Sequence, residues 1–529
     1  MGHRAGQHWV AVVVVLLGSS GCNRGGSDPA EPIEPFRGVE LRVAVLGDPQ
    51  LAAMLDDRLG EWERSRGGSV TLDAVPDIPG TQGADVIVFP GEQLGPLIDA
   101  DRLRILPESL VTTPPDRSAD PDAPSANEED EAAPLGPVSG EDLAFNQVFD
   151  VYREQVTKYG RDRVALPLGG SALVLVYRAE ALEGDDDDAL AAEAEAAGLL
   201  LEPPATWEQL DALARFLDGR DWNGDGRPDS GIALALGPDE SDRLGVETFL
   251  ARAAALGLHR DYFSLLFDPD SMAARLTAPP FVEALDALVP LLDAGPDGAS
   301  PLDAEAARLA FRSGSVAFLI DRAEQYASWL DEGDEAELGV ARLPGSDRMF
   351  EAIRGDFDPA EPPNRPGFLP NGGGWLVGVS STTPEAEAAA AEDFARYLIE
   401  PDTADRLRVD RRVPMLPVRS PLVGQGPPLG RDLPGLSRRD WSDAVSRTML
   451  ADRVLIGLRI PGAPGYLDDL AAAVASAASG DATPADALKT AADAWDARTR
   501  TLGLDRQKWH YRRSLNAFGT SDRPPPRAR

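Results

Sequence analysis

Nine residues from Asp221 to Asp229 (DWNGDGRPD) have the composition and spacing of a loop that could hold a metal ion. Gly226 allows a sharp turn at the sixth position, and the carbonyl of Arg227 can supply a ligand at the seventh. Ile232 stands where a calcium loop usually carries a bidentate glutamate. The spacing predicts a structural calcium site, and the alternative is a metal-free surface loop built from Asx turns. The oxygen-bearing side chains of this nine-residue loop stand at positions one, three, five and nine and are Asp221, Asn223, Asp225 and Asp229.

A glycine run beside an aromatic residue is the strongest candidate for solute binding. Gly372, Gly373 and Gly374 directly precede Trp375. Glycine permits close backbone approach, and an aromatic face can stack on a sugar or on a cation. The alternative is a hinge, with Trp375 packed in a core. Gly169, Gly170 and Ser171 form a second glycine-rich segment, to which the same two interpretations apply.

Two acidic residues lie just beyond the ends of predicted strands, where ligands bind in open α/β sheets. These are Asp48 and Glu92, which we include as candidate ligand contacts.

Sequence motifs that would indicate catalysis are missing. The chain has no GxSxG elbow, no HExxH zinc helix and no GxxxxGK[ST] phosphate loop. His259 and His510 stand alone in the sequence, and no motif selects a catalytic pair among the 88 acidic residues. We therefore expect no catalytic residues, no catalytic cofactor and no enzyme activity.

The formal net charge of −37 argues against nucleic acid as a partner, because phosphate binding needs clustered Lys and Arg. The N-terminus points to export instead. Arg4 precedes an apolar run from Trp9 to Leu17, and small residues then lead to Cys22, the sole cysteine. Residues 1–22 resemble a bacterial lipoprotein signal, although Ser19 stands where such signals usually have Leu. The resemblance implies lipidation of Cys22, and the alternative is an ordinary cleaved signal with an incidental cysteine.

The elements that must position these residues alternate between strands and helices. Residues 42–46 read as a buried strand, and residues 69–75 and 84–89 as two further strands, with helical patterns at 51–62 and 94–98. This alternation predicts an α/β fold with a parallel sheet. Trp207, Trp329, Trp441 and Trp495 fit the apolar faces of helices, so we expect them in cores. The predicted disordered segments are a tether at 23–39, acidic insertions at 112–134, 183–188 and 354–366, and a tail at 519–529.

The order of several segments resembles the family 1 extracellular solute-binding proteins, the maltose-binding-like receptors of ABC importers. The similarity covers roughly residues 41–505. The segments that carry it are ADVIVFPGEQLGPLIDADRLRIL from Ala84, ALPLGGSALVLVYRAEAL from Ala165, PPATWEQLDALARFL from Pro203, AFRSGSVAFLID from Ala310, GGGWLVGVS from Gly372, VPMLPVRSPL from Val413, and the C-terminal helical segment from Gly465. In the third, Thr206 and Gln209 also predict a helix-capping box.

The resemblance implies a type II periplasmic-binding-protein fold with two α/β lobes and crossing hinge strands. Lobe one is expected at 40–171 plus 378–416, and lobe two at 172–373 plus 420–505. The crossings are expected near Ser171, Trp375 and Pro417. The family often places ligand contacts after the strand 315–320, which adds Asp321, Arg322 and Tyr326. Arg419 is expected either to contact the ligand or to brace the hinge.

The resemblance further implies a monomeric substrate-binding lipoprotein that captures a small solute, expected to be a carbohydrate, in the cleft between its lobes. Permease and ATPase would be separate chains. The lipid would anchor the exported protein on the periplasmic or cell-surface side of a membrane. The alternative function is a surface glycan-processing enzyme or adhesin with the same fold, which a turnover assay on glycans would distinguish.

Overall fold

The computed structural model describes residues 34–112, 143–183, 189–239, 242–259, 264–296, 301–330, 336–427, 435–517, 520–521 and 523–525. The predicted signal, Cys22 and most of the tether lie outside this described part, as do nearly all of the predicted insertions at 112–134 and 183–188. Within the described part, every helix is too short or too polar to cross a membrane.

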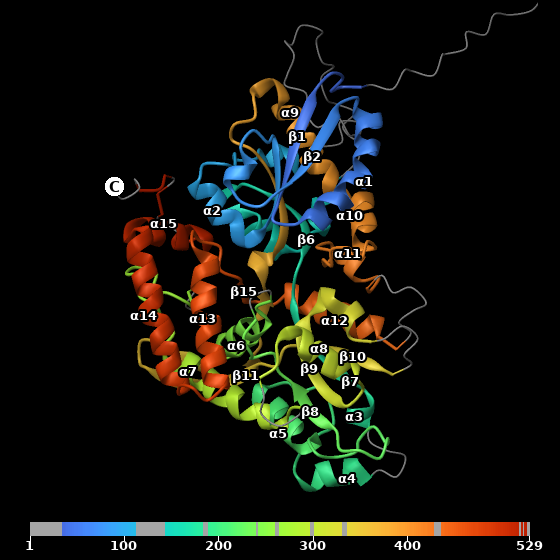
Figure 1. Ribbon diagram of the computed structural model, residues 1–529, viewed down its shortest axis with the longest axis vertical. Helices are drawn as coiled ribbons and strands as arrows, with labels where there is room; N and C mark the ends of the chain where they lie inside the picture. The colour runs from blue at the N-terminus through green and yellow to red at the C-terminus, as the bar shows by residue number, and fades with distance from the viewer. Residues whose placement is uncertain are drawn as a thin grey trace, which may run out of the picture.

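Lobe one, in the upper half of Figure 1, is built on a five-stranded sheet in the order β2-β1-β3-β14-β6. β1 pairs in parallel with β2 and β3, and β14 is antiparallel to both β3 and β6. α1 packs against β2 and β1, while α9 packs against β14, β1 and β6. The elements of this lobe are β1 (Glu40–Leu46), α1 (Pro49–Arg66), β2 (Ser69–Val75), β3 (Val86–Pro90), α2 (Leu94–Asp99), β4 (Lys158–Tyr159), β5 (Asp162–Arg163), β6 (Leu166–Gly170), β14 (Gly374–Val379), α9 (Glu385–Leu398) and α10 (Pro401–Arg408).

Lobe two contains a four-stranded sheet in the order β10-β7-β9-β8, in the lower half of Figure 1. β7 is antiparallel to β10 and β9, and β8 is parallel to β9. Helices α5 and α8 pack against β8 and β9, and α12 packs against β10 and β7. The elements are β7 (Leu173–Arg178), α3 (Glu180–Glu183), α4 (Ala189–Ala196), α5 (Trp207–Leu217), β8 (Ser230–Ala233), α8 (Ala304–Arg312), β9 (Val316–Arg322), β10 (Leu338–Arg342) and α12 (Arg438–Met449).

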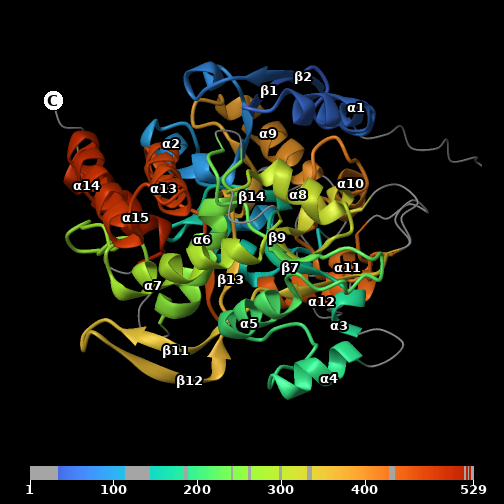
Figure 2. The ribbon, with the colours of Figure 1, turned by 60° about the horizontal axis from the view of Figure 1, so that its bottom comes forward.

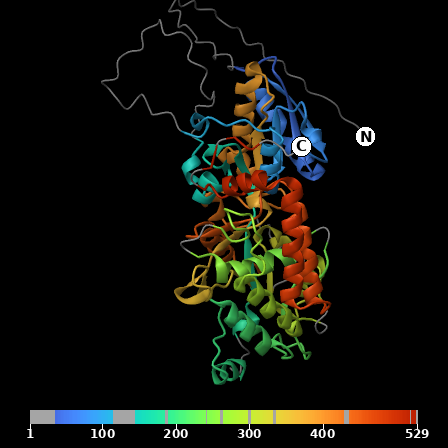
Figure 3. The same cartoon turned by 90° about the vertical axis from the view of Figure 1, so that its left-hand side faces the viewer.

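A layer of four helices, α6, α7, α13 and α14, flanks lobe two beside this sheet. The part of this layer that comes from the C-terminal end of the chain is red in Figure 3. α6 packs against α7 and α13, and α14 packs against α13 and α7. A small parallel pair, β13 with β15, lies close to the level where the lobes meet. These elements are α6 (Leu244–Gly257), α7 (Pro279–Leu288), β13 (Gly367–Leu369), β15 (Val454–Ile456), α13 (Ala463–Ala478) and α14 (Pro484–Leu502).

The last helix, α15 (Leu504–Ser514), contacts both lobes. Toward lobe one, Nε2 of the buried His510 lies 2.8 Å from Oδ1 of Asp99, and the Tyr159 hydroxyl lies 2.9 Å from Nδ1 of His510. Toward lobe two, the hydroxyls of Tyr511 and Ser264 lie 2.9 Å apart. His510 stands alone in the sequence, but the fold makes it part of a buried polar cluster between distant segments.

Local sequence signals explain where key helices begin. Asp48 caps α1 by accepting hydrogen bonds from the backbone N–H groups of Gln50 and Leu51, at 2.8 and 2.9 Å. At α5, both halves of the predicted capping box between Thr206 and Gln209 are present, so that prediction is confirmed. The four tryptophans assigned to cores, Trp207, Trp329, Trp441 and Trp495, are all buried, as predicted.

The acidic, proline-rich segment 354–366 is not a disordered insertion, and that prediction is wrong. It contributes β12 (Asp356–Asn364), which pairs antiparallel with β11 (Ser346–Glu351) in the hairpin at the lower edge of Figure 2. Phe357 packs against Phe350, with ring centroids 5.3 Å apart, and the guanidinium of Arg348 lies over the Phe357 ring. Cross-strand aromatic and cation–π contacts thus stabilise a segment whose composition alone suggested a solvated loop.

Within the described ranges, the chain passes between the lobes at three places. It leaves lobe one between β6 and β7, and it returns between β13 and β14. Residues 413–419 form the third passage, where Leu416 bridges to Gly170 of β6, and the short helix α11 (Ser420–Val423) beyond it packs against α12 of lobe two. β14 pairs with strands of lobe one along its whole length from Gly374, so the second crossing precedes Gly374. The sequence placed the end of the lobe-two segment at 373 and the return to lobe one at 378.

Candidate functional site

A cavity with a volume of about 770 Å³ lies between the lobes. Lobe one lines it with residues that follow β1, β2 and β3, including Asp48, Asp77 and Glu92. Lobe two contributes Arg243 at the start of α6 and residues from the end of β9 onward. The cavity thus lies at the carboxyl ends of the parallel strands of lobe one, where open α/β sheets bind ligands. Its volume suits a small solute.

Glycines at the crossings let three segments meet at the base of this cleft. A Cβ on Gly374 would lie 2.4 Å from the carbonyl oxygen of Gly169, and a Cβ on Gly372 would lie 2.3 Å from the backbone of Gly91 and Glu92. Gly372, Gly373 and Gly374 also have positive φ values of 66°, 99° and 111°. The glycine run is therefore required by the backbone of the hinge. Trp375 follows it, pairs with Pro90 and Gly169, and lines the cavity with a half-buried side chain.

A buried hydrogen bond joins the first crossing to lobe two at the cleft. The Ser171 hydroxyl donates to Oε1 of Glu324, and the backbone N–H of Ala172 donates to Oε2 at 3.4 Å. Burial raises the pKa of Glu324 to about 7, although Ser171 and the charge of Arg322 partly offset this. Glu324 therefore titrates near neutral pH at the point where the lobes join.

The two arginines that line the cleft are held by carboxylates. Nε of Arg322 lies 2.8 Å from Glu247, and one of its terminal nitrogens lies 2.7 Å from Asp242. Arg243 contacts Asp468 of α13 at 2.9 Å and Glu92 of lobe one at 3.5 Å. The Arg243–Glu92 pair spans the two lobes. Burial raises the pKa of Glu92, and Arg243 opposes that shift.

The structure brings together seven of the residues predicted from the sequence to contact a ligand. They come from strand ends of lobe one, from the crossings and from β9, and each lines the cleft. They are Asp48, Glu92, Gly170, Ser171, Arg322, Gly374 and Trp375. Whether each touches a solute stays a prediction.

Three other predicted contacts do not line the cleft. Asp321 is fully buried and accepts hydrogen bonds from Arg308, at 2.7 and 2.8 Å, and from the indole N–H of Trp329 at 2.9 Å. Tyr326 is buried in the turn that follows β9. Gly373 packs against Val156 instead of facing the cavity. Adjacent residues on a strand point to opposite faces, which explains why Arg322 lines the cleft and Asp321 does not.

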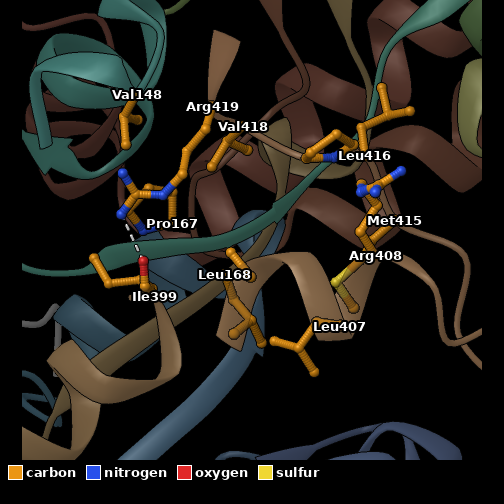
Figure 4. Close-up of a pocket in the computed structure, with 12 residues that line it drawn as sticks. Val148, Pro167, Leu168, Ile399, Leu407, Arg408, Met415, Leu416, Val418 and Arg419 are labelled. Carbon is orange, nitrogen blue, oxygen red and sulfur yellow. Dashed lines mark hydrogen bonds between the residues drawn. The ribbon is translucent and has the colours of Figure 1, made fainter. Parts of the chain in front are cut away.

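Arg419 also lies outside the cleft, in the packed hinge that Figure 4 shows. Its guanidinium donates to the carbonyls of Ile399, at 2.6 Å, and Ala144, at 2.9 Å. The surrounding void has a volume of only about 10 Å³, so no solute fits there. Of the two roles considered for Arg419, the contacts are those of a hinge brace.

The predicted calcium loop follows α5 and leads into β8. Asp229 is buried, and its Oδ2 accepts hydrogen bonds from the N–H groups of Trp222, at 3.0 Å, and Asn223, at 3.2 Å. Asp221 and Asp225 accept from the N–H groups of Gly226 and Arg227. In the described ranges, no three His, Cys, Asp or Glu side chains gather as a metal-binding group. Calcium at this loop stays a prediction.

Sequence reasoning missed three charged residues that line the cleft: Asp77, Arg243 and Glu324. Asp77 follows β2 just as Asp48 follows β1, so the same strand-end argument could have found it. Glu324 lies two residues beyond Arg322 and was within reach of the family argument. Arg243 precedes a helix, and no local pattern marks it, because its role depends on the approach of the other lobe.

Comparisons with known proteins agree with this architecture. A family model described as bacterial extracellular solute-binding protein matches residues 76–421. A solute-binding protein of an ABC transporter from Agrobacterium radiobacter K84, solved in complex with ribitol, aligns with a TM-score of 0.57 at 18% identity, covering 88% of this chain and 100% of that one. The sugar-binding protein MalE from Xanthomonas citri aligns with a TM-score of 0.59 at 15% identity, covering 88% and 98%.

A third structure, a solute-binding protein from Agrobacterium vitis S4 with bound D-mannitol, aligns with a TM-score of 0.53 at 16% identity, covering 87% of this chain and 98% of that one. No curated protein matches the chain significantly. The two-lobed α/β fold predicted from the sequence is confirmed by these likenesses.

Proposed function

This chain belongs to the bacterial extracellular solute-binding protein family, and on that premise we propose that it captures a sugar or polyol between its two lobes for an ABC importer. The observation that carries the proposal is the interlobe cavity of about 770 Å³ at the carboxyl ends of the lobe-one strands. Structures of similar fold were solved with ribitol, tagatose and mannitol, which supports polyhydroxylated solutes as the class.

The arrangement of the cleft suits capture by lobe closure. Contacts come from lobe one through Asp48 and Glu92, from lobe two through Arg322, and from the hinge through Trp375. A solute can satisfy all of them only when the lobes are together, so binding favours the closed state over the open one. The closed surface would then dock on a separate permease.

A thermal-shift screen of sugars and polyols, followed by calorimetry on each hit, tests this proposal. We expect at least one solute to raise the melting temperature and to bind with a stoichiometry of one, without being consumed. Trp375→Ala should weaken that binding. If no member of a broad panel binds, the proposal is wrong. Turnover of a glycan would instead favour the enzyme alternative.

We also propose that Cys22 is lipidated and tethers the protein to the outer side of a membrane. The support is the sequence pattern of residues 1–22, in which the sole cysteine follows an apolar run and small residues. Cell fractionation with the native signal tests this directly. The wild-type protein should sediment with membranes, whereas Cys22→Ser should appear in the soluble exported fraction. Equal distribution of the two proteins would contradict lipidation.

A further inference from the structure

The lining of the cleft is acidic. Asp48, Asp77 and Glu92 line it on the lobe-one side, and Glu324, with a pKa of about 7, is only partly ionised at neutral pH, whereas Arg243 and Arg322 are the basic residues among the described lining. The chain as a whole carries a formal charge of −37, so the surrounding field does not offset this local excess.

Neither lining arginine is available to neutralise an anionic solute. Arg322 is buried between Glu247 and Asp242, and each of these carboxylates lies within 2.8 Å of its guanidinium. Arg243 already contacts two carboxylates. The nearby Arg308 adds another positive charge but is bonded to Asp242 and Asp321. A solute carboxylate or phosphate in the cleft would therefore meet surplus negative charge.

Asp48 and Asp77 each use only one carboxylate oxygen in the hydrogen bonds that cap α1 and close the turn at Gly80. Oδ1 of Asp48 accepts both capping hydrogen bonds of α1, and Oδ1 of Asp77 accepts the N–H of Gly80 at 2.9 Å. Their Oδ2 atoms make neither contact. Burial raises the pKa values of Glu92 and Glu324, because desolvation penalises their charged forms.

An amine-bearing solute would relieve this imbalance. A protonated amine donates hydrogen bonds to carboxylate oxygens, and such charge-assisted bonds are stronger than those of a hydroxyl. The half-buried Trp375 offers an aromatic face for the same cation or for the apolar face of a ring.

We propose that the cleft selects a solute of sugar or polyol size that carries a protonated amine, and that it rejects carboxylated analogues. This inference rests on the proposed function, since it specifies the chemical class that the same cleft takes. The amine lies at the acidic edge formed by Asp48, Asp77 and Glu92, and the hydroxylated body lies toward Trp375.

Calorimetry on the full exported chain with matched solutes tests the inference. Each of three sets shares a carbon skeleton and replaces hydroxyl groups by amines or oxidises one carbon to a carboxylate: D-glucose, D-glucosamine and D-glucuronate; D-glucitol, 1-amino-1-deoxy-D-glucitol and D-gluconate; cellobiose, the deacetylated glucosamine dimer and cellobiuronate. In any set that binds, we expect the amine to bind about tenfold more tightly than the neutral member and the acid not to bind.

The outcomes separate this inference from the function on which it rests. If a neutral or acidic member binds most tightly, the amine preference is wrong and solute capture stands. If no member of any set binds, and no sugar or polyol binds in the wider screen, both are wrong. If the only sugars that bind lie outside these sets, the affinities of the aminated and carboxylated derivatives of the tightest-binding sugar are compared with its own, with the same outcomes.

A variant pair locates the amine. Asp77→Asn keeps an acceptor for Gly80 and removes one charge from the cleft, so affinity for the amine should fall about fivefold, a larger loss than for the neutral analogue. Asp73→Asn, at an exposed position of β2 outside the cleft and four residues before Asp77, is the matched control and should change neither affinity. An amine preference that Asp77→Asn leaves intact would overturn the assignment to this edge.

Discussion

The same crossing segments line two neighbouring spaces that differ in almost every property. Pro167 and Leu168 of β6 line the hinge void of about 10 Å³, whereas Gly170, at the end of the same strand, lines the cleft of about 770 Å³. Residues 414–419 likewise contribute Pro414 to the cleft and Arg419 to the hinge. Where apolar side chains and a buried arginine meet backbone carbonyls, the space closes. Where glycines, carboxylates and Trp375 meet, it stays open.

This contrast shows how one set of strands provides both a pivot and a binding site. The hinge satisfies its polar groups internally, because Arg419 donates to the carbonyls of Ile399 and Ala144. The cleft is lined by more acidic residues than arginines, and burial raises the pKa values of Glu92 and Glu324. Changes in the hinge should therefore alter stability, and changes in the cleft should alter affinity or its pH dependence.

The largest expected effect is on the hinge side of this comparison. Arg419→Met would leave two buried carbonyls without their donor, which we expect to reduce the free energy of unfolding by about 4 kcal/mol. Urea unfolding measures this. Arg447→Met, at an exposed arginine of α12, is the control and should change stability by less than about 0.5 kcal/mol. Equal losses in the two variants would remove the distinction between hinge and surface.

Glu324 should couple the cleft to pH. Its pKa of about 7 lies above the usual 4.5 of the unfolded chain, so the folded state binds the proton more tightly. The contribution of Glu324 to stability is then greatest at low pH and falls by about 3 kcal/mol as pH rises from 4.5 to 7. Glu324→Gln should remove this component of the pH dependence. Unfolding curves at pH 5, 6, 7 and 8 measure it, and identical pH profiles for both proteins would contradict the buried-carboxyl account.

Trp375→Ala should affect binding more than folding. Loss of the aromatic face should weaken solute affinity about thirtyfold, or about 2 kcal/mol. Calorimetry with the tightest solute from the screen measures the change. Trp441 is buried in the core of lobe two, so Trp441→Ala is the contrasting variant and should lower stability by about 4 kcal/mol. If Trp375→Ala lost stability instead of affinity, Trp375 would belong with the packed hinge.

The contact of α15 with lobe one should respond to pH in the opposite direction from Glu324. Burial lowers the pKa of His510. Burial alone would raise the pKa of Asp99, but hydrogen bonds from His510 and Arg506 outweigh it and lower that pKa to about 2. The unfolded chain therefore binds more protons at both residues, so stability falls as pH drops below about 6.5 and again below about 4.

His510→Gln should remove the first of these acid-dependent losses, and losing its bonds to Asp99 and Tyr159 should cost about 1 kcal/mol at pH 7. Urea unfolding at pH 7 and pH 5 measures both effects. Lys489→Gln, at an exposed ion pair of α14, should leave the pH profile unchanged. A His510→Gln profile parallel to that of the wild type would contradict a neutral, buried His510.

The smallest expected effect is at the predicted calcium loop, far from both hinge and cleft. If calcium binds there, chelation with EDTA should lower stability by less than about 1 kcal/mol and leave solute affinity unchanged. Asp225→Ala should abolish the response to EDTA. Melting temperatures with and without chelator measure it, and no difference for the wild type would favour a metal-free Asx-turn loop.

The sequence predicted features that depend on local pattern or segment order. Alternating elements indicated an α/β fold, Thr206 and Gln209 indicated a capping box, and the order of segments, through the family resemblance, indicated two lobes with a crossing near Trp375. Features that depend on distant segments were missed. Glu324 becomes a cleft residue through Ser171, and His510 gains its partners from Asp99 and Tyr159. Composition misled at residues 354–366, where a hairpin forms through cross-strand contacts of Phe357.

Small-angle scattering with and without the tightest-binding solute tests capture between the lobes most directly. The cleft draws its lining from both lobes, and Arg243 and Glu92 already span it, so a bound solute should shift the ensemble toward the closed form. We predict that the solute lowers the radius of gyration of the wild-type protein, and that the same solute concentration has little effect on Trp375→Ala. A radius that stays unchanged at saturating solute would contradict capture by closure.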